Sequence, residues 1–309
     1  LDMAMNSLNA TLPTELGKLG AGDMGYLHVK SNSMSGSLPT QIGDMTSVKL
    51  FHLASNGFTG ELPTQIGRCK ILEAVDATKN KLQGTIPTEL GSIEESLKDL
   101  SLGDNKLIST LPQSMCNLTN LVIVSLFNNE LSGEIPTCPW GFEQLEVFNV
   151  AKNSLTGSLP SVRRWPGINY LLLHSNRFTG RIEALEFNRS QHHATKIEAY
   201  DDLVNQSIDY YGKNILALTL HDNGLTGSIP KDFVLPRSLE TFTIANNKLT
   251  GHLPRSMLEF AVRNKSLTLF ATNNRLSCDL PQNWNVTSTH QSLVMIGNAF
   301  SAPVPSWVT

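Results

Sequence analysis

Histidine and acidic side chains gather in two stretches of the sequence, where they could bind a polar partner or a metal ion. An aromatic ring beside histidines and carboxylates can form polar, pH-sensitive contacts. Imidazole and carboxylate are also zinc ligands, and a solvated polar surface would carry the same residues, so three interpretations stay open. The first group comprises His174, Glu198, Tyr200, His221 and Asp222, and the second comprises His28, His52 and Asp76.

Side chains so far apart in sequence meet only if the chain returns to the same place at regular intervals, and a repeated segment does this. The stretch "NSMSGSLPTQIG" begins at Asn32, "NGFTGELPTQIG" at Asn56 and "NKLQGTIPTELG" at Asn80. A period of about two dozen residues is typical of a solenoid. The leading asparagines are Asn6, Asn32, Asn56, Asn80, Asn105, Asn129, Asn153, Asn176, Asn223, Asn247, Asn274 and Asn298.

Apolar residues precede each asparagine by five and three positions, and most of them also by eight, as Leu97, Leu100 and Leu102 precede Asn105. Between the positions five and three before the asparagine, apolar and variable residues alternate, and this alternation predicts a half-buried strand. Successive coils then pair these strands into a parallel sheet, and stacking supplies the core. The positions four and two before each asparagine face outward, and most of the two polar groups falls there. The asparagine amide can satisfy backbone groups of its own coil and of its neighbour.

The combined pattern, LxxLxLxxNxLxGxIPxxLGxL, resembles the 24-residue leucine-rich repeat of plant receptor-like ectodomains, a type that also occurs in algae and protists. The resemblance implies an α/β solenoid of about 13 coils. A parallel concave β-sheet would lie on one side, with short 3-10, loop and helix segments on the convex side. In this family the ligand usually contacts the concave sheet. Repeats of this kind are scaffolds, so the resemblance does not specify a ligand.

The repeat is interrupted between Asn176 and Asn223, which are 47 residues apart, or about two periods. The spacing predicts a degenerate coil with a long outer loop over residues 183–214. In that coil Asp202 takes the asparagine position, and Ile197 and Ala199 take the apolar positions. The alternative is an inserted segment, of the sort that some plant receptors use to bind a ligand.

The periodicity favours a single solenoid over residues 1–309. The sequence opens at "LDMAMN", inside a strand, and stops at "VPSWVT", inside a coil. Solenoids need polar caps at their ends, so we expect a fragment of a larger chain.

Four cysteines are too few for a disulfide framework. Cys116 and Cys138 fall at similar places in successive coils and could form a disulfide on the outer surface, or stay reduced. Cys69 occupies a position that suits a small buried residue. The N-glycosylation candidates favour a secreted or lumenal route, and they are Asn9, Asn117, Asn188, Asn205, Asn264 and Asn285.

Composition argues against several classes of function. The net charge is −3 with no run of Lys or Arg, which argues against nucleic-acid binding. No apolar stretch approaches the roughly 20 residues of a membrane helix. The register brings together no nucleophile with a base, and no glycine-rich phosphate loop is present. We predict no catalytic residue, no bound metal and no cofactor.

The leading hypothesis is a non-enzymatic extracellular or cell-surface recognition module. It would bind a protein, peptide or glycan and would be part of a receptor-like protein. The alternative is a structural or adhesive scaffold packed against neighbouring chains of an assembly. A polygalacturonase inhibitor ranks third. Ice binding ranks fourth, because the threonine row that would support it is better explained by turn-capping hydroxyls; this row is Thr14, Thr40, Thr64 and Thr88.

Overall fold

The computed structural model divides the chain into two compact units. Unit 1 comprises Leu1–Thr156 with Arg164–Gly167, and unit 2 comprises Gly157–Arg163 with Ile168–Thr309. The single solenoid over residues 1–309 stays a prediction, and each unit is described by itself. The structure describes residues 1–19, 25–139, 142–162, 165–185, 217–231, 233, 235, 239–258, 267–277 and 292–300.

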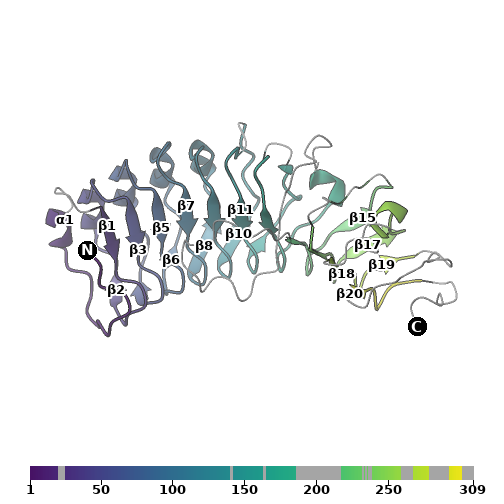
Figure 1. Ribbon diagram of the computed structural model, residues 1–309, viewed down its shortest axis with the longest axis horizontal. Helices are drawn as coiled ribbons and strands as arrows, with labels where there is room; N and C mark the ends of the chain where they lie inside the picture. Colours follow the sequence, from purple (N-terminus) through teal and green to yellow (C-terminus); the bar gives the residue numbers. More distant parts are fainter. Residues whose placement is uncertain are drawn as a thin grey trace. The chain divides into compact units, whose positions relative to one another are not determined.

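Six short parallel strands form the main sheet of unit 1, one from each coil (Figure 1). Equivalent residues of successive coils pair, so that Leu27 lies opposite Phe51 and Leu100 opposite Val124. These four central residues are fully buried, which confirms the predicted alternation. The strands are β1 (Tyr26–His28), β3 (Leu50–His52), β5 (Ala74–Asp76), β7 (Asp99–Ser101), β9 (Ile123–Ser125) and β11 (Val147–Asn149).

Unit 2 repeats this arrangement with five parallel strands. Leu171, Leu218 and Phe242 stack in register as its buried central column. The strands are β13 (Tyr170–Leu172), β14 (Ala217–Thr219), β16 (Thr241–Thr243), β18 (Thr268–Phe270) and β20 (Ser292–Val294).

The pairing of β13 with β14 bears on the predicted degenerate coil at 183–214, which lies mostly outside the described residues and stays a prediction. Tyr170 lies opposite Ala217, and the Leu173 amide donates to the carbonyl of Thr219 at 3.0 Å. In the described part of the chain β13 and β14 are therefore neighbouring strands of one sheet. The interval of 47 residues therefore corresponds to one regular 24-residue coil and 23 further residues. Residues 186–216 lie outside the described part of the chain, and the alternative of an inserted segment fits this register.

An asparagine ladder joins the coils, and Asn129 illustrates it. Its Nδ2 donates to the carbonyls of Leu126 and Phe127 in its own coil and to that of Leu102 in the preceding coil, at 3.0–3.2 Å. Its Oδ1 accepts the amide of Leu107 at 2.9 Å. One side chain thus satisfies four backbone groups at a corner where the backbone cannot pair as a regular β-strand.

Short strands follow the ladder in both units. In unit 1 they form one two-stranded and one four-stranded parallel sheet, and in unit 2 a three-stranded one. They are β2 (Ser35–Ser37) with β4 (Gly57–Thr59), β6 (Gln83–Gly84) with β8 (Lys106–Thr110), β10 (Glu130–Gly133) and β12 (Ser154–Leu155), and β15 (Thr226–Ser228) with β17 (Lys248–Gly251) and β19 (Arg275–Leu276).

Helical turns complete the coils on the far side from the main sheet. The residue before each of the helices η1 to η4 is an extended proline, as at Pro39 and Pro87. The threonine hydroxyls that follow donate to the next side chain, as Thr88 does to Glu89 at 3.2 Å, so the expectation of turn-capping hydroxyls is wrong for these residues. The helices are α1 (Leu16–Leu19), η1 (Thr40–Asp44), η2 (Thr64–Arg68), η3 (Thr88–Ser92), η4 (Gln113–Asn117) and η6 (Ile182–Leu185).

Candidate binding surface

The outward face of the unit 1 sheet carries a cluster of charged side chains on its first four strands. His28 Nδ1 lies 3.3 Å from Asp2 Oδ1, and the His28 and His52 rings meet edge to face with centroids 4.9 Å apart. Lys30 Nζ lies 4.0 Å from Asp76 Oδ2. We call Asp2, His28, Lys30, His52, Asp76 and Asp99 the N-terminal patch. It contains the predicted group of His28, His52 and Asp76 on neighbouring strands.

His52 is the least solvated histidine of this patch. Its burial lowers the pKa of its imidazole, an effect that Asp76 opposes and that His28 and Lys30 reinforce. The Nε2 atom is buried and has no hydrogen-bond partner. The ring is therefore neutral at neutral pH, and the fold leaves this buried nitrogen unsatisfied.

Asp99 belongs to the N-terminal patch, although it was absent from the predicted site residues. Burial raises its pKa to about 7, with a further increase from the Asp76 charge, while a hydrogen bond from Ser101 opposes the shift. The Ser101 hydroxyl donates to Asp99 Oδ1 at 2.6 Å. Asp99 stands six positions before its asparagine, so the period-two alternation extended by one more step would have found it.

The second predicted group is only partly within the described residues. His174 and His221 stack with ring centroids 4.4 Å apart and planes 12° from parallel. Each Nδ1 is hydrogen-bonded to a threonine hydroxyl of the next strand, His174 to Thr219 at 2.8 Å and His221 to Thr243 at 2.7 Å. Asp222 Oδ2 lies 3.9 Å from His221 Nε2. Glu198 and Tyr200 lie outside the described residues.

Neither histidine pair forms a metal site in the described part of the chain, where no group of three or more His, Cys, Asp or Glu side chains is placed to hold an ion. The His174 and His221 rings stack face to face, and each points one nitrogen at a threonine. The pair therefore resembles a fixed aromatic surface more closely than a pair of converging ligands.

Uncharged residues occupy the outward positions of unit 1 from the end of β7 onward, and several of them are small. They include Ser101, Ser125 and Gly103. The Phe127 ring lies against Gly103, where an added Cβ would collide with it. Gly103 thus makes room for one aromatic side chain on an otherwise flat surface.

The remaining predicted residues are cysteines and glycosylation candidates. Cys116 and Cys138 are joined by a disulfide across successive coils, with Cα atoms 5.1 Å apart. Cys69 is free and buried, and its burial raises the pKa of the thiol to about 11, so this thiol is unreactive. Of the glycosylation candidates, Asn9 and Asn117 are exposed; Asn188, Asn205, Asn264 and Asn285 lie outside the described residues.

Comparison with known proteins identifies the repeat. The model of the Leucine Rich Repeat family matches residues 96–118, the coil that contains β7, β8 and η4. The crystal structure of a TDR receptor superposes with a TM-score of 0.75 at 26% identity, over 91% of this chain and 44% of that one. The chain therefore has the fold of a leucine-rich repeat solenoid.

Two further proteins extend the similarity. The Arabidopsis receptor kinase HAESA, in complex with the peptide hormone IDA and the co-receptor SERK1, superposes with a TM-score of 0.68 at 26% identity, over 97% of this chain and 53% of that one. Receptor-like protein 35 of Arabidopsis thaliana is 30% identical over 146 residues, which are 47% of this chain and 15% of that protein. The chain thus spans about a sixth of this curated relative and about half of the two solved structures. No described helix is both long and apolar enough to cross a membrane.

Proposed function

We propose that this chain is a non-enzymatic, extracellular recognition module of a receptor-like protein, which binds a protein, peptide or glycan through its repeat surface. The observation that carries the proposal is the outward face of the unit 1 sheet. There the N-terminal patch, with its unsatisfied buried His52 nitrogen, adjoins an uncharged stretch that carries one aromatic ring. Similarity to peptide hormone receptor ectodomains of 25–26% identity, HAESA with IDA and RGFR1 with RGF2, supports the same class of ligand.

A displayed peptide library tests this proposal. Peptides would be selected on the secreted chain and then measured against Ser125→Trp, which blocks the flat part of the main sheet, and His52→Phe, which removes the unsatisfied nitrogen. The matched control is Gln144→Trp on an exposed turn outside that sheet. We expect the first two variants to lose most of the binding and the control to keep it. Peptides that bind all three variants equally would contradict a ligand site on the main sheet.

The alternative of a structural or adhesive scaffold has one observation in its favour. The outward residues from Ser101 to Ala151 in unit 1 are uncharged, and they include the small side chains of Ser101, Ser125 and Ala151, as suits a surface that packs against an uncharged neighbour. A scaffold would yield no selectable ligand in the peptide experiment and would instead form assemblies with chains from the same extracellular matrix.

A further inference from the structure

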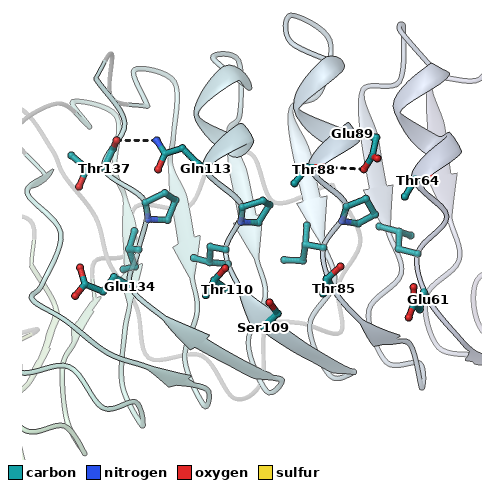
Figure 2. Close-up of a pocket in the computed structure, with 17 residues that line it drawn as sticks. Glu61, Thr64, Thr85, Thr88, Glu89, Ser109, Thr110, Gln113, Glu134 and Thr137 are labelled. Atoms are coloured by element: carbon teal, nitrogen blue, oxygen red, sulfur yellow. Dashed lines mark hydrogen bonds between the residues drawn. The ribbon is translucent and has the colours of Figure 1, made fainter.

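A groove of about 750 Å³ runs along one flank of unit 1, away from the main sheet (Figure 2). Its floor consists of an apolar residue and a proline from each coil, such as Ile86 with Pro87 and Leu111 with Pro112, all buried. Polar side chains form the two rims. Glu61, Ser109 and Glu134 lie on one rim, with Glu89 and Gln113 on the other.

The coil at the centre of this groove departs from the repeat in two ways. Ser109 has a backbone φ of +76°, the value that glycine takes in neighbouring coils at Gly84 (+75°) and Gly133 (+74°). A residue with a side chain is strained in this region. The residue before it, Ile108, is 47% exposed, where Thr59, Gln83 and Ser132 stand in the neighbouring coils. Folding alone would favour glycine and a polar residue at these two positions.

The groove is negatively charged. Glu61, Glu89 and Glu134 are exposed carboxylates, and none of them is ion-paired with a described residue. No Lys, Arg or His is among the lining residues. Hydroxyls and carboxylates on the rims accept hydrogen bonds, so a complementary occupant carries cations and donors and presents apolar surface to the floor.

One rim is held rigidly. The disulfide between Cys116 and Cys138 ties the central coil to the next one, and Gln113 Nε2 donates to the carbonyl of Thr137 at 3.2 Å. A groove fixed in this way loses little conformational entropy when a ligand binds.

We propose that this groove binds an extended peptide segment with two basic residues four positions apart and an apolar residue midway between them. Glu61 and Glu134 occupy equivalent positions three coils apart, which is about 14 Å at the strand spacing of a parallel sheet. Four residues of extended chain cover about the same distance. Residues i, i+2 and i+4 share one face, so the cations reach the two glutamates while the apolar side chain lies on Leu111 and Pro112. The Ser109 hydroxyl is then a hydrogen-bonding group for the peptide backbone. This surface is separate from the main sheet, and the inference does not rest on the function proposed above.

Fluorescence anisotropy with a labelled peptide of sequence KTITK tests the proposal. We expect saturable binding to the whole chain that Glu61→Gln and Glu134→Gln each weaken about fivefold. Glu94→Gln, an exposed carboxylate outside the groove, should bind as the unmodified chain does. Ser109→Gly should weaken binding while raising Tm, a combination that a purely structural serine would not produce.

Several outcomes would overturn the proposal. One is the absence of saturable binding. Another is that KTIKT, whose lysines are three positions apart, or spermidine binds as tightly as KTITK does. Either result would mean that the groove attracts polycations without recognising the spacing of their charges. Loss of binding in Ser125→Trp would place the peptide on the main sheet instead. Concentration-dependent dimerisation in sedimentation that Glu61→Gln abolishes would assign the groove to a second copy of this chain. Because library peptides are tested on the main sheet and KTITK on the groove, either proposal can fail while the other stands.

Discussion

The two histidine pairs on the main sheets come from neighbouring strands, yet they differ in sequence spacing and in what holds them. His28 and His52 are 24 residues apart, meet edge to face and lie among charged groups. His174 and His221 are 47 residues apart, stack in parallel and are each hydrogen-bonded to a threonine. Position in the repeat, and not distance along the chain, therefore decides which side chains meet. The two histidine pairs then acquire different hydrogen-bonding and charged neighbours from the coils on either side of them.

The most disruptive test of this comparison removes a ladder asparagine beside each pair. Asn56 and Asn223 each form four equivalent hydrogen bonds to backbone groups. Two of the Asn223 bonds, to Leu173 and Phe178, reach the coil of Asn176, which lies 47 residues earlier in the sequence. We expect Asn56→Ala and Asn223→Ala to lower the free energy of unfolding by a similar amount, about 2–4 kcal/mol in denaturant titrations, because buried backbone groups lose their partners.

Hydrogen exchange locates the loss. The Phe178 amide should lose protection in Asn223→Ala, and the Met34 amide in Asn56→Ala. Asn120→Ala, which removes one exposed bond to the carbonyl of Glu95, serves as the control. If the Phe178 amide kept its protection in Asn223→Ala, a coil would lie between β13 and β14 after all.

An intermediate effect is expected from Asp99, which makes the N-terminal patch pH-dependent. The pKa of Asp99 is about 7 in the folded chain against an ordinary value of 3.8. Between these values the folded state holds a proton that the unfolded chain has released, so stability falls as pH rises through this window. We expect Asp99→Asn to remove that decline and to be more stable than the unmodified chain at pH 8 by about 1–3 kcal/mol.

Thermal denaturation from pH 4 to pH 8 measures the difference. Asp44→Asn, at an exposed carboxylate paired with Arg68, should keep the slope of the unmodified chain. Parallel slopes for Asp99→Asn and the unmodified chain would show that Asp99 is ionised throughout.

The smallest effect is expected from shortening the long interval. Deleting residues 190–212 restores a 24-residue spacing between Asn176 and Asn223. Because β13 already pairs with β14, we expect a change in unfolding free energy within about 1 kcal/mol, the scale of a loop-length effect. Deleting residues 107–118, which breaks the period inside a regular coil, should abolish cooperative unfolding measured by circular dichroism. Collapse of the first variant would mean that the deleted residues belong to the core.

Features set within one period could be predicted from the sequence. The buried column at Leu100 and Val124 follows from alternation, and the proximity of Cys116 to Cys138 follows from their matching places in successive coils. The interval between Asn176 and Asn223 could not be interpreted in this way, because 23 further residues nearly equal one period and so match either a weak coil or an inserted segment. The groove was also beyond prediction. It depends on the backbone angle at Ser109 and on carboxylates of coils that are not adjacent, neither of which a repeat pattern encodes.

The direct pairing of β13 with β14 also bears on how this protein is made. A ribosome that extends the chain at about 5–20 residues per second delivers each ordinary coil to the growing stack at a steady pace. At this step 23 more residues must emerge first, a delay of roughly 1–5 s, and closing the longer loop costs about 0.6 kcal/mol more. During that pause the edge of β13 is an unpaired template, so a chaperone that shields nascent chains would be needed there more than at any ordinary coil.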